Sequence, residues 1–61
     1  MAGKFQIIKD TAGEYRWHLR AEGNWEIIAD SGEGYKEKDD CKHGIDLVKA
    51  QAAGAVIEDE S

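Results

Sequence analysis

The chain has 61 residues with 13 acidic and 8 basic side chains, which gives a formal net charge of −5. It can hold at most one small domain, and a domain of this size hides only about 60% of the surface of its unfolded chain. Its core is therefore thin, and such cores often depend on a metal, a disulfide or a partner chain. The acidic balance repels phosphate backbones and argues against broad nucleic-acid binding.

Cysteine content and hydropathy indicate where the protein works. Cys41 is the only cysteine, which excludes a disulfide within the chain and favours a reducing compartment, with the cytoplasm as the default. No apolar run approaches the about 20 residues of a membrane-spanning helix. Residues 1–4 lead into a strand pattern and not into the apolar block of a signal peptide. We therefore expect a cytoplasmic protein without a membrane partner.

The first predicted element is a strand over residues 4–9. Phe5 and Ile7 share one side of a period-two pattern, as a strand with one mainly buried face requires. The following segment, 10–13, combines the carboxylate of Asp10 with a glycine that can take positive φ, which predicts a turn. A hairpin follows from these two features.

The second strand, Glu14 to Ala21, has the clearest alternation in the chain. One face carries Tyr15, Trp17 and Leu19, and the other carries Arg16, His18 and Arg20. A second tight turn over residues 22–24 leads to a third strand from Trp25 to Asp30, in which Ile27 or Ile28 must point outward unless both faces are covered. The three strands predict an antiparallel meander.

The predicted helix runs from Glu37 to about Ala50, after a glycine-rich break at residues 31–34. An apolar stripe at helical spacing faces the sheet and consists of Cys41, Gly44, Ile45, Val48 and Ala52. The opposite side is mostly a solvated face and carries Lys38, Asp39, Lys42, Asp46 and Lys49. Gly44 costs about 1 kcal/mol of helix propensity relative to Ala, which favours a close approach of the helix backbone to the sheet.

The chain after the helix predicts a fourth strand. Gly54 marks the helix stop, Ala55 to Glu58 form a short strand pattern, and the acidic end of the chain is expected to fray. The order β-β-β-α-β predicts an α+β fold in one domain over residues 1–61, with an ordered core of about 3–58. There is no internal repeat and no linker, so no second domain is expected.

The predicted core joins the helix to the sheet through apolar side chains of both layers: Phe5, Ile7, Tyr15, Trp17, Leu19, Ile27, Cys41, Ile45 and Val48, with Val56 from the fourth strand. The conformational entropy lost on ordering the chain is about as large as the free energy gained by burying this small core. A second copy of the chain is therefore the simplest means of burying more apolar surface. The meander alone cannot hide Trp25 and Ile28. We place them, with Val56 and Ile57, near a dimer seam, the alternative being that they are scattered exposed residues.

Metal chemistry has few candidates in this sequence. The soft metal ligands are His18, Cys41 and His43, whereas a structural zinc site needs four. Cys41 and His43 lie two apart on the helix and so point in different directions. No metal is expected, and Cys41 is interpreted as a small buried hydrophobic residue with an inert thiol.

Catalytic motifs are weak as well. A nucleophile scheme would combine Cys41 or Ser31 with a histidine, but no nucleophile-elbow spacing is present. The loop 31–34 lacks the longer frame of a phosphate-binding loop, and Glu33 would repel a phosphate. The segment 10–14 offers too few oxygen ligands for a calcium loop. We expect no enzyme activity and no cofactor.

The basic row on the second strand offers one alternative function. Arg16, His18 and Arg20 share a sheet face and predict a weak anion or single-stranded nucleic-acid site, to which Trp25 or Tyr35 could add base stacking. The other interpretation is a solvated face or cross-strand pairing with Glu14, Glu26 and Asp30. The negative net charge disfavours nucleic acid as a partner.

Over nearly its whole length the chain resembles the YegP-like family of small uncharacterised proteins. The resemblance rests on GKFQI at residues 3–7, AGEYRW at 12–17, IIA at 27–29, GEGY at 32–35 and GIDLVK at 44–49. It implies a β3-α-β unit that occurs twice in tandem in one chain or once per chain in a homodimer. In both versions the two units share one antiparallel sheet and exchange their C-terminal strands.

With a single unit, the sequence is similar to the dimeric version, in which residues 55–58 would cross to the other subunit. Lys36 departs from the family pattern because a Ser or Thr that could cap the helix commonly stands there, and Asp39 and Asp40 replace small residues. The helix start is therefore open by a residue or two, although both carboxylates favour the positive end of the helix dipole.

The resemblance brings no catalytic residues with it. We therefore expect a homodimeric, non-catalytic interaction or accessory module of unknown role, for which no protein partner other than itself can be named. A connector of about three residues before the fourth strand allows that strand either to be exchanged or to dock on its own chain.

Overall fold

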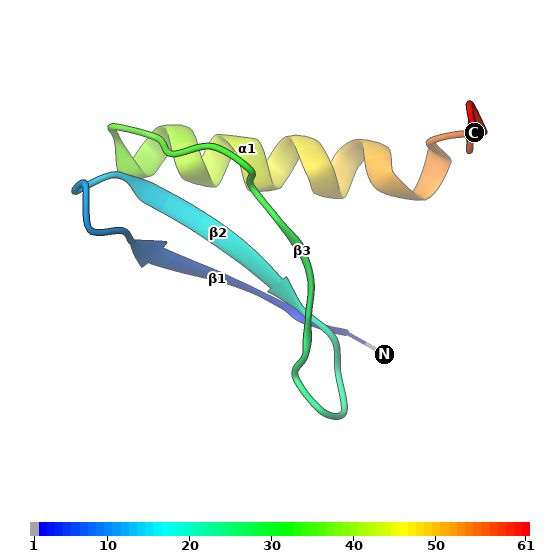
Figure 1. Cartoon of the computed structure of the whole chain (residues 1–61), viewed down its shortest axis with the longest axis horizontal. Coiled ribbons are helices and arrows are strands. Elements are labelled where there is room, and N and C mark those ends of the chain that lie inside the picture. Colours follow the sequence, from blue (N-terminus) through cyan, green and yellow to red (C-terminus); the bar gives the residue numbers. More distant parts are fainter. Residues whose placement is uncertain (1) are drawn as a thin grey trace.

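A computed structural model describes residues 2–61, so Met1, the first residue of the predicted domain, lies outside the described part of the chain. Three strands, β1 (Lys4–Lys9), β2 (Tyr15–Arg20) and β3 (Ile27–Asp30), are followed by helix α1 (Lys38–Gln51) and a short 3₁₀ helix, η1 (Ala52–Gly54). The helix lies across one face of the sheet, and the C-terminal end of the chain lies beyond the last turn of the helix (Figure 1).

The sheet has the order β1-β2-β3 with both pairs antiparallel, which confirms the predicted meander. Phe5 lies opposite Leu19, and Ile7 lies opposite Trp17, so the apolar residues of the first two strands share one face. In the turn between β1 and β2, Gly13 has a φ of 83°, a conformation that glycine adopts without steric cost. The turn predicted for residues 10–13 is therefore confirmed.

The contact between helix and sheet is centred on Trp17, which is 5% exposed, and Cys41, which is fully buried. The rings of Phe5 and Trp17 pack in a T-shaped arrangement, with centroids 5.3 Å apart and planes inclined by 76°. The other predicted core side chains apart from Ile27 and Val56 are half-buried: Phe5, Ile7, Tyr15, Leu19, Ile45 and Val48. One helix on a three-stranded sheet thus covers its apolar face only in part.

The third strand is shorter than predicted, because it begins at Ile27 and not at Trp25. Trp25 has a φ of 57°, which breaks the extended backbone. The register then shifts between Leu19 and Arg20, so that Ile27 lies opposite Arg20. Ile27 is 43% exposed and Ile28 61%; the predicted burial of Ile27 under the helix does not occur in the single chain, because the bulge re-aims this strand.

The segment predicted as the fourth strand, residues 55–58, has no strand structure in the single chain. Val56 is 86% exposed and Ile57 is 97% exposed, whereas Val56 was expected in the core. The reason lies in the connection: α1 and η1 carry the chain past the end of the sheet (Figure 1), so within residues 2–61 this segment has no strand partner. The α+β class is confirmed, and the predicted fourth strand is wrong for one chain by itself.

Helix α1 begins within a residue of its predicted start. Glu37 is the N-cap, with an extended backbone and no hydrogen bond from its side chain, and Asp39 and Asp40 lie in the first turn. A Cβ added to Gly44 would lie 2.6 Å from Tyr35 Oη and 3.7 Å from Trp17 Nε1. The helix is therefore closely approached at Gly44, as predicted, but by the Tyr35 side chain of the strand-to-helix connection, whereas the sheet itself contributes only the more distant Trp17.

Candidate functional site

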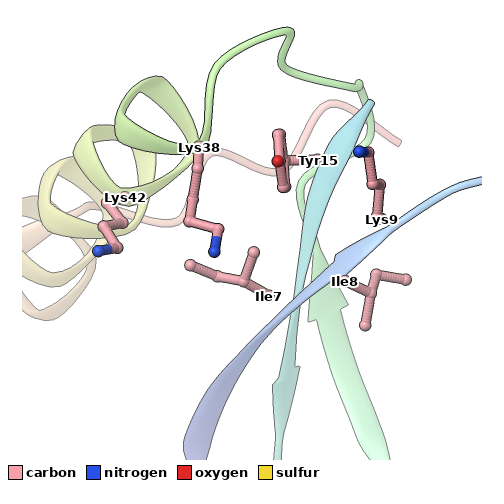
Figure 2. A pocket seen from close by; sticks show the side chains of 6 residues that line it. All are labelled: Ile7, Ile8, Lys9, Tyr15, Lys38 and Lys42. Carbon is pink, nitrogen blue, oxygen red and sulfur yellow. The ribbon is translucent and has the colours of Figure 1, made fainter. Parts of the chain in front are cut away.

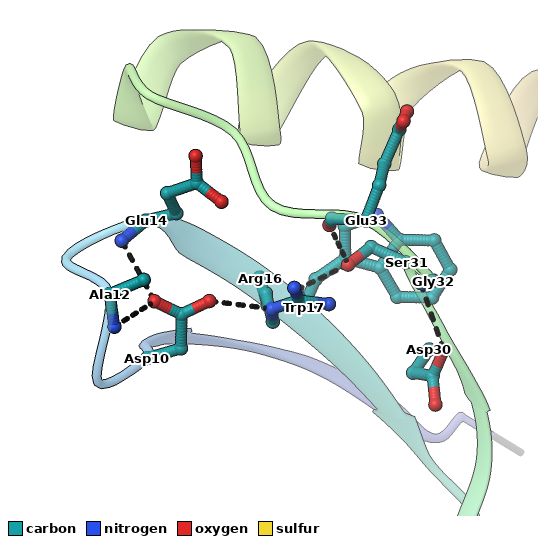
Figure 3. Close-up of polar contacts among 9 residues, drawn as sticks. All are labelled: Asp10, Ala12, Glu14, Arg16, Trp17, Asp30, Ser31, Gly32 and Glu33. Carbon is teal, nitrogen blue, oxygen red and sulfur yellow. Dashed lines mark hydrogen bonds and ion pairs between the residues drawn. The ribbon is translucent and has the colours of Figure 1, made fainter.

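The basic row on β2 begins at Arg16, whose Nε donates a hydrogen bond of 2.7 Å to Asp10 Oδ2 (Figure 3). The other oxygen of this carboxylate, Oδ1, accepts hydrogen bonds of 2.9 Å from the amides of Ala12 and Glu14. Asp10 therefore closes the β1–β2 turn with one oxygen and holds the first arginine of the row with the other.

This arrangement shifts the acidity of both groups. The hydrogen bond from Arg16 and those from the backbone amides of Glu14 and Ala12 hold the pKa of Asp10 below its ordinary value. The same carboxylate raises the pKa of Arg16. The sequence had offered Glu14, Glu26 and Asp30 as partners of the row. The sequence also contains a sign that Asp10 could pair with Arg16. When the alternation of the first strand is continued by one residue, Asp10 falls on the same face of the sheet as Arg16.

The other arginine, Arg20, is also engaged by its own chain. Its Nε donates to Gln6 Oε1 at 2.9 Å, and its Nη1 donates to the carbonyl oxygen of Trp25 at 3.0 Å. His18 lies between the arginines, opposite Gln6 on one side and Asp30 on the other. Its Nδ1 is buried and has no hydrogen-bond partner among the described residues. Strand alternation thus brings the three predicted residues together, but their polar atoms mostly hold the hairpin.

The loop that resembled a phosphate cradle is held together by Ser31. The Ser31 hydroxyl donates to the carbonyl oxygen of Glu33 at 2.8 Å and accepts a longer hydrogen bond of 3.4 Å from the Trp17 amide. The amide of Gly32 donates to Asp30 Oδ1 at 2.9 Å, as Figure 3 also shows. These contacts fasten the strand-to-helix connection to β2, so they explain Ser31 as a turn residue.

Cys41 and the two histidines do not gather. Burial raises the pKa of the Cys41 thiol, which keeps it in the protonated, unreactive form. Among residues 2–61, no group of three or more His, Cys, Asp or Glu side chains is placed to hold a metal ion. In the same residues, no helix has the length and apolar character needed to cross a membrane.

The residues predicted for a dimer seam all lie at the surface. Trp25 is 42% exposed, and Lys4 Nζ lies 4.7 Å from the centroid of its ring, a cation–π contact that fixes the indole beside β1. Ile28, Val56 and Ile57 are more exposed still, and Leu47 on α1 is 47% exposed. The chain therefore presents apolar side chains on β3, on the helix and on its C-terminal segment.

A hollow of about 340 Å³ lies at the opposite edge of the sheet, between β1 and the first turns of α1. We call it the basic groove and define it by its lining: Ile7, Ile8, Lys9, Tyr15, Lys38 and Lys42. Figure 2 shows Lys38 and Lys42 extending from the helix, with Lys38 reaching toward Ile7. Lys9 Nζ lies 5.4 Å and Lys38 Nζ 5.7 Å from the centroid of the Tyr15 ring, so the aromatic ring stands between two cations.

The basic groove was not predicted. Lys38 and Lys42 are exposed, as their place on the solvated side of the helix implied, and Lys9 ends a strand far from them in the sequence. Only the packing of α1 across β1 and β2 brings the three ammonium groups around one apolar floor. The sequence signal was limited to two lysines at i and i+4, which also suits an ordinary surface.

These observations define a small α+β domain with exposed apolar segments, two free sheet edges and a basic groove. The chain belongs to the family described as a domain of unknown function (DUF1508), which it matches over residues 10–59. A UPF0339 protein of Neisseria meningitidis serogroup B is 49% identical over 55 residues, which cover 90% of this chain and 95% of that one. The resemblance to the small uncharacterised YegP-like proteins is thereby confirmed, and the function of the family is unknown.

Two further relatives bear on architecture. A solution NMR structure of a protein from Haloferax volcanii has a TM-score of 0.86 and 41% sequence identity, covering 95% of both chains. A UPF0339 protein of Stutzerimonas stutzeri is 44% identical over 52 residues, which are 85% of this chain but only 45% of the relative. That relative is therefore roughly twice as long as the matched unit.

Proposed function

We propose that the protein is a non-catalytic interaction module that works as a homodimer. Two copies join their sheets into one antiparallel sheet and exchange their C-terminal segments as added strands. The observation that carries the proposal is the excess of exposed apolar surface on one chain, above all Val56 and Ile57, which are 86% and 97% exposed.

The total surface of the chain supports this proposal. A folded monomer of 6.8 kDa is expected to expose about 3,950 Å², whereas this chain exposes 4894 Å². The excess, about 900 Å², is close to the roughly 800 Å² that each partner buries in an interface of standard size. The radius of gyration, 12.7 Å, likewise exceeds the about 10.5 Å expected for a compact domain of this length. A second copy would remove surface that one chain leaves uncovered.

The unpaired edge strands of the sheet support the proposed pairing with the sheet and the C-terminal segment of a second copy. β1 and β3 each pair only with β2 in the described chain, and an unpaired edge is a ready template for another strand. Ile28, 61% exposed, lies on the β3 edge, beside the turn that holds Trp25. The edge strands β1 and β3 are therefore the places where the sheet of a second copy and its C-terminal segment would pair. The double-length relative from Stutzerimonas stutzeri is consistent with two units in one molecule.

The proposal includes a location in the cytoplasm and a role without catalysis. A lone, buried Cys41 suits a reducing compartment such as the cytoplasm. The polar side chains that suggested chemistry, Asp10, Arg16 and Ser31, are used in turns and strand pairing. An interaction role needs only the surfaces already described, which is why we prefer it to a catalytic one.

Sedimentation equilibrium of the full chain and of a version ending at Gly54 tests the homodimer. We expect the full chain to be a dimer at micromolar concentration and the shortened chain to dissociate at least tenfold more readily and to melt at a lower temperature, because it lacks the exchanged strand. Ser61→Ala, a change at the same end outside the proposed strand, is the matched control. A full chain that stays a compact, heat-resistant monomer would contradict the proposal.

A weak anion or single-strand binder is the alternative function, favoured by the one-sided placement of Arg16, His18 and Arg20 on β2. A labelled oligonucleotide at low salt provides its test. A salt-sensitive shift that is lost when Arg16 and Arg20 are both changed to Ala would support it. The absence of any shift at low salt would end it.

A further inference from the structure

The lysines of the basic groove have no acidic partners. Three of the 8 basic side chains of the molecule, Lys9, Lys38 and Lys42, line this hollow, and no carboxylate belongs to its lining in the described chain. Among residues 2–61 the one ion pair joins Arg16 to Asp10, so none of the three lysines is neutralised. A chain with a net charge of −5 has an excess of carboxylates, yet it leaves this cluster positive.

The positive charge of the groove is held close to one aromatic ring. Lys9 Nζ and Lys38 Nζ lie 5.4 and 5.7 Å from the centroid of the Tyr15 ring, within the range of a cation–π contact. Lys38 and Lys42 are about one helical turn apart, a spacing at which like charges destabilise a helix. A negatively charged ligand would relieve this repulsion, because it would place the opposite charge between the ammonium groups.

The remaining surface of the groove is apolar. Ile7 and the Tyr15 ring form its floor on the helix side, and Figure 2 shows Lys38 extending toward Ile7. Ile8 lies on the other face of β1, because neighbouring side chains of a strand alternate, and it forms the outer rim. The volume of about 340 Å³ is at the lower end of the range for small-molecule sites, about 300 to 1,000 Å³. The groove therefore has the size for a small molecule with a single compact ring system.

We infer that the basic groove binds a small aromatic anion, a planar ring system that carries a phosphate, sulfonate or carboxylate group. The acidic group lies among the ammonium groups of Lys9, Lys38 and Lys42, and the ring lies against Ile7 and Tyr15. An aromatic body is favoured over an alkyl chain for two reasons. A rigid ring loses less conformational entropy on binding than a flexible chain, and its face also attracts lysine ammonium groups, as the Tyr15 ring does.

This site goes beyond the proposed homodimer and does not depend on it. Helix α1 lies across one face of the sheet (Figure 1), so Lys38 and Lys42 stand above that face. A strand added to the edge of β1 would instead continue the plane of the sheet. A polyanion is disfavoured as the occupant, because the net charge of −5 repels it, whereas a small ligand meets mainly the local charge of the groove.

Titration of the full chain with 1-naphthyl phosphate, followed by NMR chemical shifts, tests the inference. At about pH 8 the phosphate is a dianion, and at low ionic strength its contacts with exposed charges are least screened. We expect saturable binding. Inorganic phosphate, which is the acidic group alone, and 1-naphthol, which is the ring alone, should each bind about tenfold more weakly or worse. Octyl phosphate, which replaces the ring by a flexible chain, should bind about threefold more weakly.

Removal of two lysines should weaken this binding without loss of the fold. Glutamine has about the helix propensity of lysine, so Lys38→Gln with Lys42→Gln should leave the circular dichroism spectrum unchanged. The dissociation constant of 1-naphthyl phosphate should rise about fivefold or more in this variant. The matched control is Lys36→Gln with Lys49→Gln, which removes the same charge from two exposed lysines outside the groove. It should change the dissociation constant less than about twofold.

Nuclear Overhauser contacts between ligand and protein locate the site. We expect cross-peaks from the naphthyl protons to the methyl groups of Ile7 and to the Tyr15 ring. Cross-peaks to His18 or Trp25 in their place would put the anion on the opposite face of the sheet or at the β2–β3 turn, and either result would overturn the inference. Cross-peaks to the exposed segment 55–58 in their place would show that the ring only follows apolar surface, with the same consequence.

The inference also fails if the wild type shows no saturable binding up to millimolar ligand, if both double variants weaken binding equally, or if octyl phosphate binds as tightly as 1-naphthyl phosphate. Sedimentation of the same samples keeps this result separate from the proposed function. A monomeric wild type that binds 1-naphthyl phosphate beside Ile7 would remove the homodimer and leave the site. A dimer without such binding would remove the site alone.

Discussion

Asp10 shows how one side chain can determine a local structure and its pH dependence. Its two oxygens bind the amides of Ala12 and Glu14 and the Arg16 guanidinium, and its pKa is lowered as a result. The folded chain therefore resists protonation of this carboxyl more than the unfolded chain does. The stabilisation is complete above the unfolded pKa of about 3.9 and is lost as the pH falls through the lower, folded value.

Asp10→Asn isolates the charge, because the amide oxygen can still accept the turn hydrogen bonds. We expect the variant to melt at a lower temperature than the wild type at pH 7, and the difference to shrink below about pH 4 as the wild-type carboxyl protonates. Thermal melts between pH 2 and pH 7 measure this, with Glu26→Gln as the control for a simple loss of negative charge. A difference that stays constant across this range would show that the charge on Asp10 does not act through Arg16.

Residue-level chemistry was only partly accessible from the sequence. The turn role of Asp10 followed from its type and from the glycine after it, but its pairing with Arg16 required the register of the hairpin. Trp25 shows the opposite case. No local rule predicts a positive φ for a tryptophan, and this single conformation, with the bulge beside Arg20, explains why β3 starts two residues late.

At the scale of elements, Gly44 is where α1 packs closely against the side chain of Tyr35, in the connection between β3 and the helix. A methyl group at this position would lie 2.6 Å from Tyr35 Oη and 3.1 Å from Tyr35 Cζ, and Tyr35 is held to Tyr15 by paired backbone hydrogen bonds. Alanine would gain about 1 kcal/mol of helix propensity, whereas overpacking costs about 1 to 3 kcal/mol. Because the Tyr35 ring is rigid, we expect the cost of overpacking to exceed the gain in helix propensity, so that alanine destabilises the fold.

We expect Gly44→Ala to lower the free energy of unfolding by about 1 kcal/mol or more in urea titrations. In a chain that already carries Tyr35→Phe the same substitution should cost less, because the atom it meets first is gone. The double-mutant cycle therefore yields a measurable coupling between the two positions. Equal costs in both backgrounds, or a stabilised Gly44→Ala chain, would place the closest contact elsewhere.

The elements themselves were largely predictable because each depends on local patterns. Strict alternation over Tyr15 to Arg20 and helical spacing from Cys41 to Val48 are properties of neighbouring residues, and both elements occur within a residue or two of their predicted bounds. Residues 55–58 carry an equally clear strand pattern, yet they form no strand in one chain. A strand needs a partner edge, and neighbouring residues do not reveal whether its own chain supplies one.

At the scale of the whole molecule, the shortage of core could be predicted and the means of covering it could not. Chain length and the small apolar set implied that one copy covers itself poorly, and only Trp17 and Cys41 are buried hydrophobic residues in the described chain. The basic groove depends on Lys9 of β1 meeting Lys38 and Lys42 of α1. That meeting is a property of the packed fold, so no window of sequence contained it.

The most direct test of the account is an isotope-filtered NOE experiment on a dimer assembled from equal parts of ¹³C-labelled and unlabelled chains. Only contacts between different chains give signals in this spectrum. We predict cross-peaks from the methyl groups of Val56 and Ile57 in one chain to isoleucine side chains of an edge strand in the other, Ile7 and Ile8 of β1 or Ile27 and Ile28 of β3. A sample that sediments as a dimer but shows none of these intermolecular cross-peaks would contradict the exchanged strand.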